Sequence, residues 1–167
     1  DAVLALIIKS ANDVATVVAE HISKTEQEFA KLMTAYARNI GMENTTFKNA
    51  SGLPNKSQMT TARDIATLSH ALILNFPEEY KLFSREKFVW KGKTYKTHNR
   101  LMQSYEGADG IKTGYLAVEK YSLASSLVKN ERRLIAVGSG FKNKASRSRQ
   151  SNKLLNYGLS HFDTIKI

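Results

Sequence analysis

Residues 109–139 read DGIKTGYLAVEKYSLASSLVKNERRLIAVGS, and this stretch decides the fold. Its β-branched and aromatic residues fall into three short runs, Ile111–Tyr115, Tyr121–Val128 and Arg132–Ser139. Runs of this kind favour strands, and the polar turn at 129–131 is short enough to join the last two as antiparallel neighbours. The stretch therefore predicts an antiparallel sheet.

The sequence on both sides of this stretch also predicts regular secondary structure. Downstream, Leu154, Leu155 and Leu159 predict a closing helix over Ser146–Leu159. Upstream, aromatic and β-branched residues alternate about the turn Lys91-Gly92-Lys93, which predicts a hairpin. The alternating residues are Phe88, Trp90, Tyr95 and Thr97.

The first half of the chain has helical spacing instead. A first helix is predicted from Val14 to Ile22, with Asn12 and Asp13 as N-cap candidates. A second begins at the capping-box pattern of residues 25–28 and ends at Gly41. Its expected apolar face consists of Phe29, Leu32, Met33, Tyr36 and Ile40.

A third helix is predicted to begin at Thr61 and to end at Asn75-Phe76-Pro77. Its expected buried face consists of Ile65, Leu68 and Leu72. Between the second and third helices, residues 42–59 are rich in Asn, Thr, Ser and Gly, which indicates a long ordered loop. Helices first, then antiparallel strands, then a helix predict an α+β fold with helices packed on the sheet, in one domain spanning 1–167.

Composition narrows the function only partly. The 167 residues carry a formal charge of +10 and contain no Cys, which excludes disulfides and thiolate metal sites. An excess of cations suits nucleic acid, an anionic surface or an acidic substrate. The cations are scattered and accompany no nucleic-acid motif, so nucleic acid is not an expected partner. No metal or other cofactor is expected, since the four His residues lack metal-ligand spacing.

Two short motifs can carry chemistry, Ser10-Ala11-Asn12 and Lys112-Thr113-Gly114. Taken alone, the first is more simply interpreted as a helix cap, and the second as a solvated strand end. Their order and context favour a site, because a helix-connecting loop can offer hydroxyl and amide groups while an edge strand offers a cation, a hydroxyl and backbone donors.

At this point the sequence resembles a known family. Successive signatures of D-alanyl-D-alanine carboxypeptidases, low-molecular-mass penicillin-binding proteins of serine peptidase family S11, resemble four stretches of this chain. These are Ile8–Ala15, Ala50–Pro54, Thr60–Asp64 and Asp109–Gly114. The resemblance implies a β-lactamase/transpeptidase-like fold, and acyl transfer in which a serine attacks the bond between two terminal D-alanines of peptidoglycan stem peptides. It also implies β-lactam antibiotics as ligands and a location outside the cytoplasmic membrane.

The resemblance further implies roles for matching residues. Ser10 would join the proton relay and Asn12 would donate its amide to the substrate backbone. The charge of Lys112 would hold both the proton-relay network and the substrate carboxylate, and Thr113 would donate a hydroxyl to that carboxylate. Gly114 would admit the substrate backbone. The backbone N–H of Tyr115 would complete the oxyanion hole.

Arg147 would bind the terminal carboxylate of D-alanine, with Arg149 as a competing candidate. His21, His70, His98 and His161 are expected at the surface or at helix ends.

In this family the nucleophile belongs to an SxxK motif several tens of residues before the serine triad. That place lies upstream of Asp1, and we expect the chain to lack the motif, together with the first strands and the nucleophile helix. The opening run Ala2–Ile8 is consistent with a chain cut inside a helix. No signal peptide or membrane-spanning run is visible, so any peripheral membrane association would use parts not present here.

Three hypotheses remain open. The first is a D-Ala-D-Ala carboxypeptidase that is inactive as this isolated chain. The second is a serine β-lactamase or esterase of the same fold, which would release penicillin where a carboxypeptidase would retain it. The third is a non-catalytic peptidoglycan-binding domain.

Overall fold

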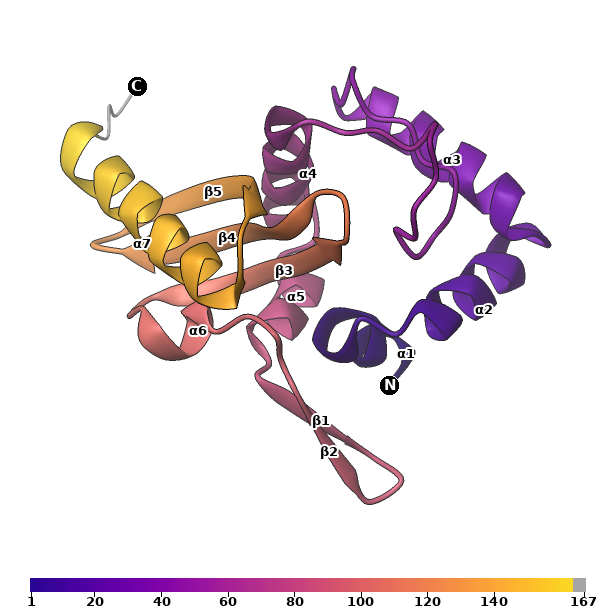
Figure 1. Ribbon diagram of the computed structural model, residues 1–167, viewed down its shortest axis with the longest axis horizontal. Helices are drawn as coiled ribbons and strands as arrows, with labels where there is room; N and C mark the ends of the chain where they lie inside the picture. The colour runs from indigo at the N-terminus through magenta and orange to yellow at the C-terminus, as the bar shows by residue number, and fades with distance from the viewer. Residues whose placement is uncertain (164–167) are drawn as a thin grey trace. The chain divides into compact units, whose positions relative to one another are not determined.

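The computed structural model describes residues 1–163 and divides the chain into two compact units, Asp1–Thr97 and His98–Ile167. We describe each unit by itself (Figure 1). The prediction of a single domain over 1–167 stays a prediction.

Unit 1 is mainly helical. Its elements are α1 (Ala2–Leu4), the π-helical turn η1 (Ala5–Lys9), α2 (Asn12–Ser23), α3 (Glu26–Asn39), α4 (Ala62–Asn75), α5 (Pro77–Tyr80), the 3₁₀ turn η2 (Lys81–Ser84), β1 (Lys87–Trp90) and β2 (Lys93–Lys96). Strands β1 and β2 form the predicted hairpin. The three predicted helices are present, and the helical reading of Ala2–Ile8 corresponds to α1 and η1. The short α5 and η2 were not predicted, because periodicity carries little signal over four residues.

Helix starts in unit 1 show which capping predictions succeeded. The hydroxyl of Thr25 accepts the N–H of Glu28, and the hydroxyl of Thr61 accepts the N–H of Asp64. The prediction that Asn12 or Asp13 caps α2 was wrong. Extended Ala11 is the N-cap and makes no side-chain cap bond, so both polar residues lie inside the first turn.

Two predicted buried faces needed correction as well. On α3, Leu32 and Tyr36 are 38% and 65% exposed, and the buried residues of that helix are Ala30 and Ala37. On α4, Leu68 is 39% exposed while Asp64 is buried. Periodicity located the helices but ranked their apolar positions by size, whereas close packing favoured small residues.

Unit 2 contains α6 (Leu101–Ser104), β3 (Ala108–Leu116), β4 (Lys120–Lys129), β5 (Arg132–Phe141) and α7 (Lys144–His161). The strands form an antiparallel sheet in the order β3-β4-β5, so the predicted antiparallel pairing is confirmed. Helix α7 lies across one face of this sheet (Figure 1). The buried cluster of unit 2 consists of Leu101 from α6, Leu155 from α7, and Leu123, Leu127 and Ala136 from the sheet.

Candidate functional site

The Lys112-Thr113-Gly114 motif lies in β3, at one edge of the three-stranded sheet. Side chains alternate across a strand, so Lys112 and Gly114 share one face and Thr113 lies on the other. An edge strand also presents backbone N–H and C=O groups on its open side, where an extended peptide can pair with it. The motif lies within the strand and not at its end, since β3 runs from Ala108 to Leu116.

Lys112 is held in an environment that disfavours its charge. Its side chain is half-buried, and its ammonium donates to the carbonyl of Thr113 at 3.1 Å. Burial lowers the pKa of Lys112 to about 8, and the charge of Arg147 acts in the same direction. The lysine still carries its proton at neutral pH, but a bound anion would be stabilised strongly there.

Arg147 supplies a second cation in the same unit, and this one is buried. It is 3% exposed, at the start of α7, and its guanidinium donates to the carbonyl of His98 at 2.7 Å. It also lies 5.8 Å from the ring centroid of Tyr121. Burial lowers the pKa of Arg147, and Arg100 adds to this, while Tyr121 raises it. Arg149 is exposed, so burial favours Arg147 of the two candidates.

The pairing of β3 with β4 explains why residue 114 is a glycine, and the strand places the side chain of Tyr115 at the surface. A Cβ built on Gly114 would lie 2.4 Å from the hydroxyl oxygen of Ser122, its partner on β4. No side chain fits there without a shift. Tyr115 is 59% exposed and its ring lies 4.6 Å from that of Tyr121, so its side chain lies at the surface while its backbone belongs to the strand.

The Ser10-Ala11-Asn12 motif lies in unit 1, at the junction of η1 and α2. Ser10 has φ +57°, in the left-handed region that a serine seldom adopts. It ends a π-helical turn, and π-turns recur at functional sites. Ile8, 1% exposed, anchors this turn in the core, while Ser10 and Asn12 are exposed. The junction thus holds two polar side chains at the surface on a fixed backbone.

The long loop is held to α4 by one carboxylate. Asp64 is 2% exposed and accepts from the hydroxyl of Thr45 at 2.6 Å and from the backbone N–H of Asn44 at 2.8 Å. The Thr45 hydroxyl is the largest cause of a lowered pKa for Asp64. The same hydroxyl lies 2.8 Å from that of Thr60, so the Thr60–Asp64 stretch fixes the beginning of the loop.

Asn49 organises the middle of that loop. Its Oδ1 accepts from the N–H of Gly52 at 2.7 Å, and its Nδ2 donates to the carbonyl of Leu53 at 2.9 Å. Gly52 has φ +81°, which explains the glycine of the Ala50–Pro54 stretch. Sequence reasoning missed Asn49 and Thr45. Asn in a turn-rich loop was the available signal for the first, while nothing in the sequence pairs Thr45 with a residue 19 positions later.

A family model for D-alanyl-D-alanine carboxypeptidase, Peptidase_S11, matches residues 1–143. The chain belongs to this family. It is 37% identical over 161 residues to the D-alanyl-D-alanine carboxypeptidase DacC of Escherichia coli, and this match covers 96% of the chain and 40% of DacC. The chain therefore spans about two fifths of the length of this curated relative.

Solved structures agree with this family and fold. Penicillin-binding protein 5 from Haemophilus influenzae matches with a TM-score of 0.94 and 33% identity, over 99% of this chain and 48% of that one. Penicillin-binding protein D2 from Listeria monocytogenes, solved in its ampicillin-bound form, matches with a TM-score of 0.88 and 29% identity. That match covers 96% of this chain and 67% of the other. The expected α+β, transpeptidase-like fold is confirmed.

The expectation that this carboxypeptidase-family chain lacks an SxxK pattern was wrong as a statement about sequence. Three tetrapeptides match it, beginning at Ser84, Ser126 and Ser139. None of the three is helical throughout: Ser84 ends η2 before β1 begins, 126–129 lie in β4, and 139–142 run out of β5.

The SxxK pattern can bring a lysine to a serine hydroxyl only on a helix, because residues three apart lie on one face of a helix but on opposite faces of a strand. The environments agree with this. Ser126 is fully buried and its hydroxyl accepts from Arg133, and the hydroxyl of Ser84 donates to the carbonyl of Lys81. None of the three pairs has the helical spacing that brings a lysine to a serine hydroxyl.

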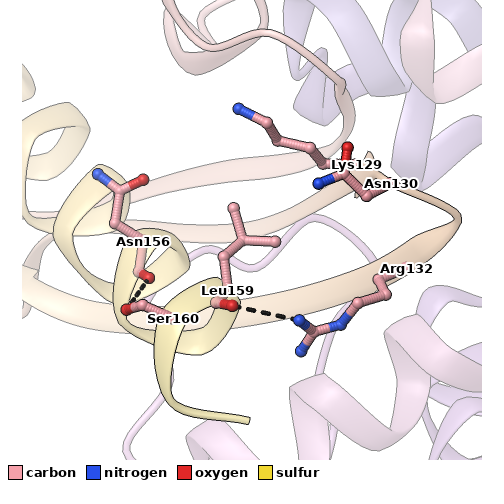
Figure 2. Close-up of a pocket in the computed structure, with 6 residues that line it drawn as sticks. All are labelled: Lys129, Asn130, Arg132, Asn156, Leu159 and Ser160. Atoms are coloured by element: carbon pink, nitrogen blue, oxygen red, sulfur yellow. Dashed lines mark hydrogen bonds between the residues drawn. The ribbon is translucent and has the colours of Figure 1, made fainter. Parts of the chain in front are cut away.

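One groove of unit 2 is lined by none of the predicted site residues. Figure 2 shows it where the β4–β5 turn meets the last turn of α7. Its volume is about 410 Å³. It is lined by Lys129, Asn130, Arg132, Asn156, Leu159 and Ser160. Arg132 donates to the carbonyls of Leu159 and Gly158, so its charge already serves the helix C-terminus.

Proposed function

We propose that the protein containing these residues is a serine-type D-Ala-D-Ala carboxypeptidase that removes the terminal D-alanine from peptidoglycan stem peptides. The observation that carries the proposal is a pair of cations in unit 2, half-buried Lys112 on an edge strand and buried Arg147 at the start of α7. A peptide ending in a free carboxylate supplies both things this arrangement favours, a strand partner for β3 and an anion for the cations.

The acyl-enzyme route assigns each remaining residue a task. Thr113 would donate its hydroxyl to the substrate carboxylate, and Gly114 would leave room for the substrate backbone. The N–H of Tyr115 would stabilise the oxyanion of the tetrahedral intermediate. Ser10 would relay a proton to the leaving nitrogen, and Asn12 would donate to a substrate carbonyl.

The nucleophile would come from outside residues 1–167. Two observations support this: the curated relative DacC is longer than this chain, and none of the three Ser-x-x-Lys tetrapeptides is helical throughout. We therefore expect no hydrolysis of D-Ala-D-Ala peptides by residues 1–167 alone, because an unassisted serine hydroxyl is a poor nucleophile at neutral pH. β-Lactam antibiotics would acylate the same nucleophile, and the enzyme would act outside the cytoplasmic membrane.

The test is covalent labelling of the full-length gene product by a fluorescent penicillin. Lys112→Ala should abolish labelling, while Lys129→Ala, an exposed lysine at the end of the neighbouring strand, should not. Equal labelling of both variants would remove Lys112 from the site. Rapid release of the penicillin would indicate a β-lactamase instead, and no labelling of the wild type would indicate a non-catalytic binding domain.

Arg147 is tested by comparing two ligands. Arg147→Ala should weaken hydrolysis of D-Ala-D-Ala peptides more than it weakens penicillin acylation, because the terminal carboxylate of the peptide is the group it would bind. Arg149→Ala, two residues along the same helix and exposed, is the matched control and should change neither rate. Equal losses for both ligands in Arg147→Ala would contradict the assignment.

A further inference from the structure

The hairpin of unit 1 has a fixed base and an uncovered tip. At the base, Phe88 is 9% exposed and stacks on Tyr95 with ring centroids 5.2 Å apart. The ammonium of Lys9 in η1 lies 5.9 Å from the Tyr95 ring centroid. The strands then run out to a turn at Lys91 and Gly92, both at positive φ, as a two-residue hairpin turn requires (Figure 1).

At the tip, in contrast to the base, apolar side chains are exposed. Trp90 is 46% exposed and Val89 is 61% exposed. They are adjacent in β1, so they point to opposite faces of the hairpin. A large exposed aromatic ring at the end of a two-stranded ribbon adds little to folding stability, and such rings are typical of binding surfaces.

The same segment concentrates positive charge. Between residues 85 and 96 there are five cations and one anion, so 12 residues carry a net +4 of the chain's +10. The cations are Arg85, Lys87, Lys91, Lys93 and Lys96. Lys91 places its ammonium 6.0 Å from the Trp90 ring centroid, and Lys93 places its own 5.5 Å from that of Tyr95. Each tip lysine thus lies beside an aromatic ring.

We propose that this tip, Val89 to Lys93, is a second binding site for the peptidoglycan polymer, separate from the residues that hold the scissile peptide. Trp90 would stack on the apolar face of a sugar ring, and Lys91 and Lys93 would pair with stem-peptide carboxylates. The proposal rests on the proposed function for the identity of the polymer. Its physical basis is the complementarity between the lysine ammonium groups and the stem-peptide carboxylates, next to the exposed ring of Trp90.

A lipid surface fits the tip less well. The turn itself contains Lys91, so insertion of the hairpin into an apolar phase would bury an ammonium group. One tryptophan and one valine also offer little apolar area, and interfacial binding scales with that area. A hydrated, carboxylate-bearing polymer can accept the ring and both lysines without dehydrating the charges.

The experiment is co-sedimentation of the full-length protein with purified insoluble peptidoglycan. Trp90→Ala should weaken binding about tenfold, and Trp90→Phe should retain most of it. The double variant Lys91→Gln, Lys93→Gln should lose up to about fivefold per lysine, and 0.5 M salt should reduce the wild type to a similar level. The charge-matched control Lys120→Gln, Lys129→Gln uses exposed lysines of β4 and should bind like the wild type.

Three results would overturn the proposal. One is unchanged binding in both tip variants, and another is an equal loss in the β4 control, which would mean that only net charge matters. The third is a tip-dependent binding to vesicles of equal parts phosphatidylglycerol and phosphatidylcholine with unchanged binding to peptidoglycan. Hydrolysis of a short soluble D-Ala-D-Ala peptide should be unaffected in the tip variants. If the wild type fails that assay but still needs Trp90 to sediment, the proposed function fails and the binding site does not.

Discussion

Replacing Lys112 by methionine should make the folded protein more stable at neutral pH while removing the proposed carboxypeptidase activity. The side chains have similar length, and methionine keeps the apolar packing without the ammonium group. In the wild type the fold binds the Lys112 proton less tightly than the unfolded chain does, because burial and Arg147 lower its pKa. The charge therefore costs folding free energy wherever the unfolded lysine is protonated.

The magnitude follows from the pKa. A lowering from 10.5 to about 8 corresponds to about 3 kcal/mol of unfolding free energy at pH 7. Loss of the Lys112 ammonium's hydrogen bond to the Thr113 carbonyl offsets about 1 kcal/mol, so a net gain of about 2 kcal/mol is expected for Lys112→Met. The cost is fully present below the folded pKa near 8 and is relieved as the pH rises towards 10.5.

The assay is urea unfolding of the wild type and of Lys112→Met at pH 7 and pH 10. Between these pH values the wild type should gain about 2 to 3 kcal/mol relative to the variant, because its half-buried lysine loses its proton. Lys129→Met, which alters an exposed lysine, should show no such pH-dependent difference. A wild type and Lys112→Met whose stabilities differ by the same amount at both pH values would refute the reasoning.

The other predictions concern stability at three further positions. Thr61→Ala should destabilise the protein by about 1 kcal/mol in thermal unfolding because α4 loses its N-cap, and Thr61→Ser should recover it. Gly114→Ala should cost about 1 kcal/mol through overlap with the Ser122 hydroxyl, and adding Ser122→Ala should restore the melting temperature. The Asp64 carboxylate, whose pKa is lowered below 3.8, should stabilise the fold above that pH and lose its effect as the pH falls through the folded pKa. The melting-temperature difference between wild type and Asp64→Asn should therefore shrink on acidification; a constant difference from pH 6 to pH 3 would contradict this.

Local features were predictable where the sequence itself contains the cause. Thr25 and Thr61 cap their helices because the hydroxyl and the N–H it accepts are three residues apart. The hairpin turn at Lys91-Gly92 and the antiparallel pairing of β3, β4 and β5 follow from short connections and alternating side chains. Periodicity, capping and short turns are local, so one sequence shows them.

Other features depended on residues far apart in the chain. Ser10 has a left-handed backbone conformation, and α2 begins at Asn12, earlier than predicted. The buried residues of α3 are small ones, Ala30 and Ala37. The sequence by itself determined the family signatures, the order of helices and strands, and the excess of positive charge. Only tertiary structure decided that Arg147 and not Arg149 is buried, that Asp64 binds Thr45, and that the three Ser-x-x-Lys tetrapeptides lack helical spacing, because burial and side-chain pairing arise only when distant segments pack together.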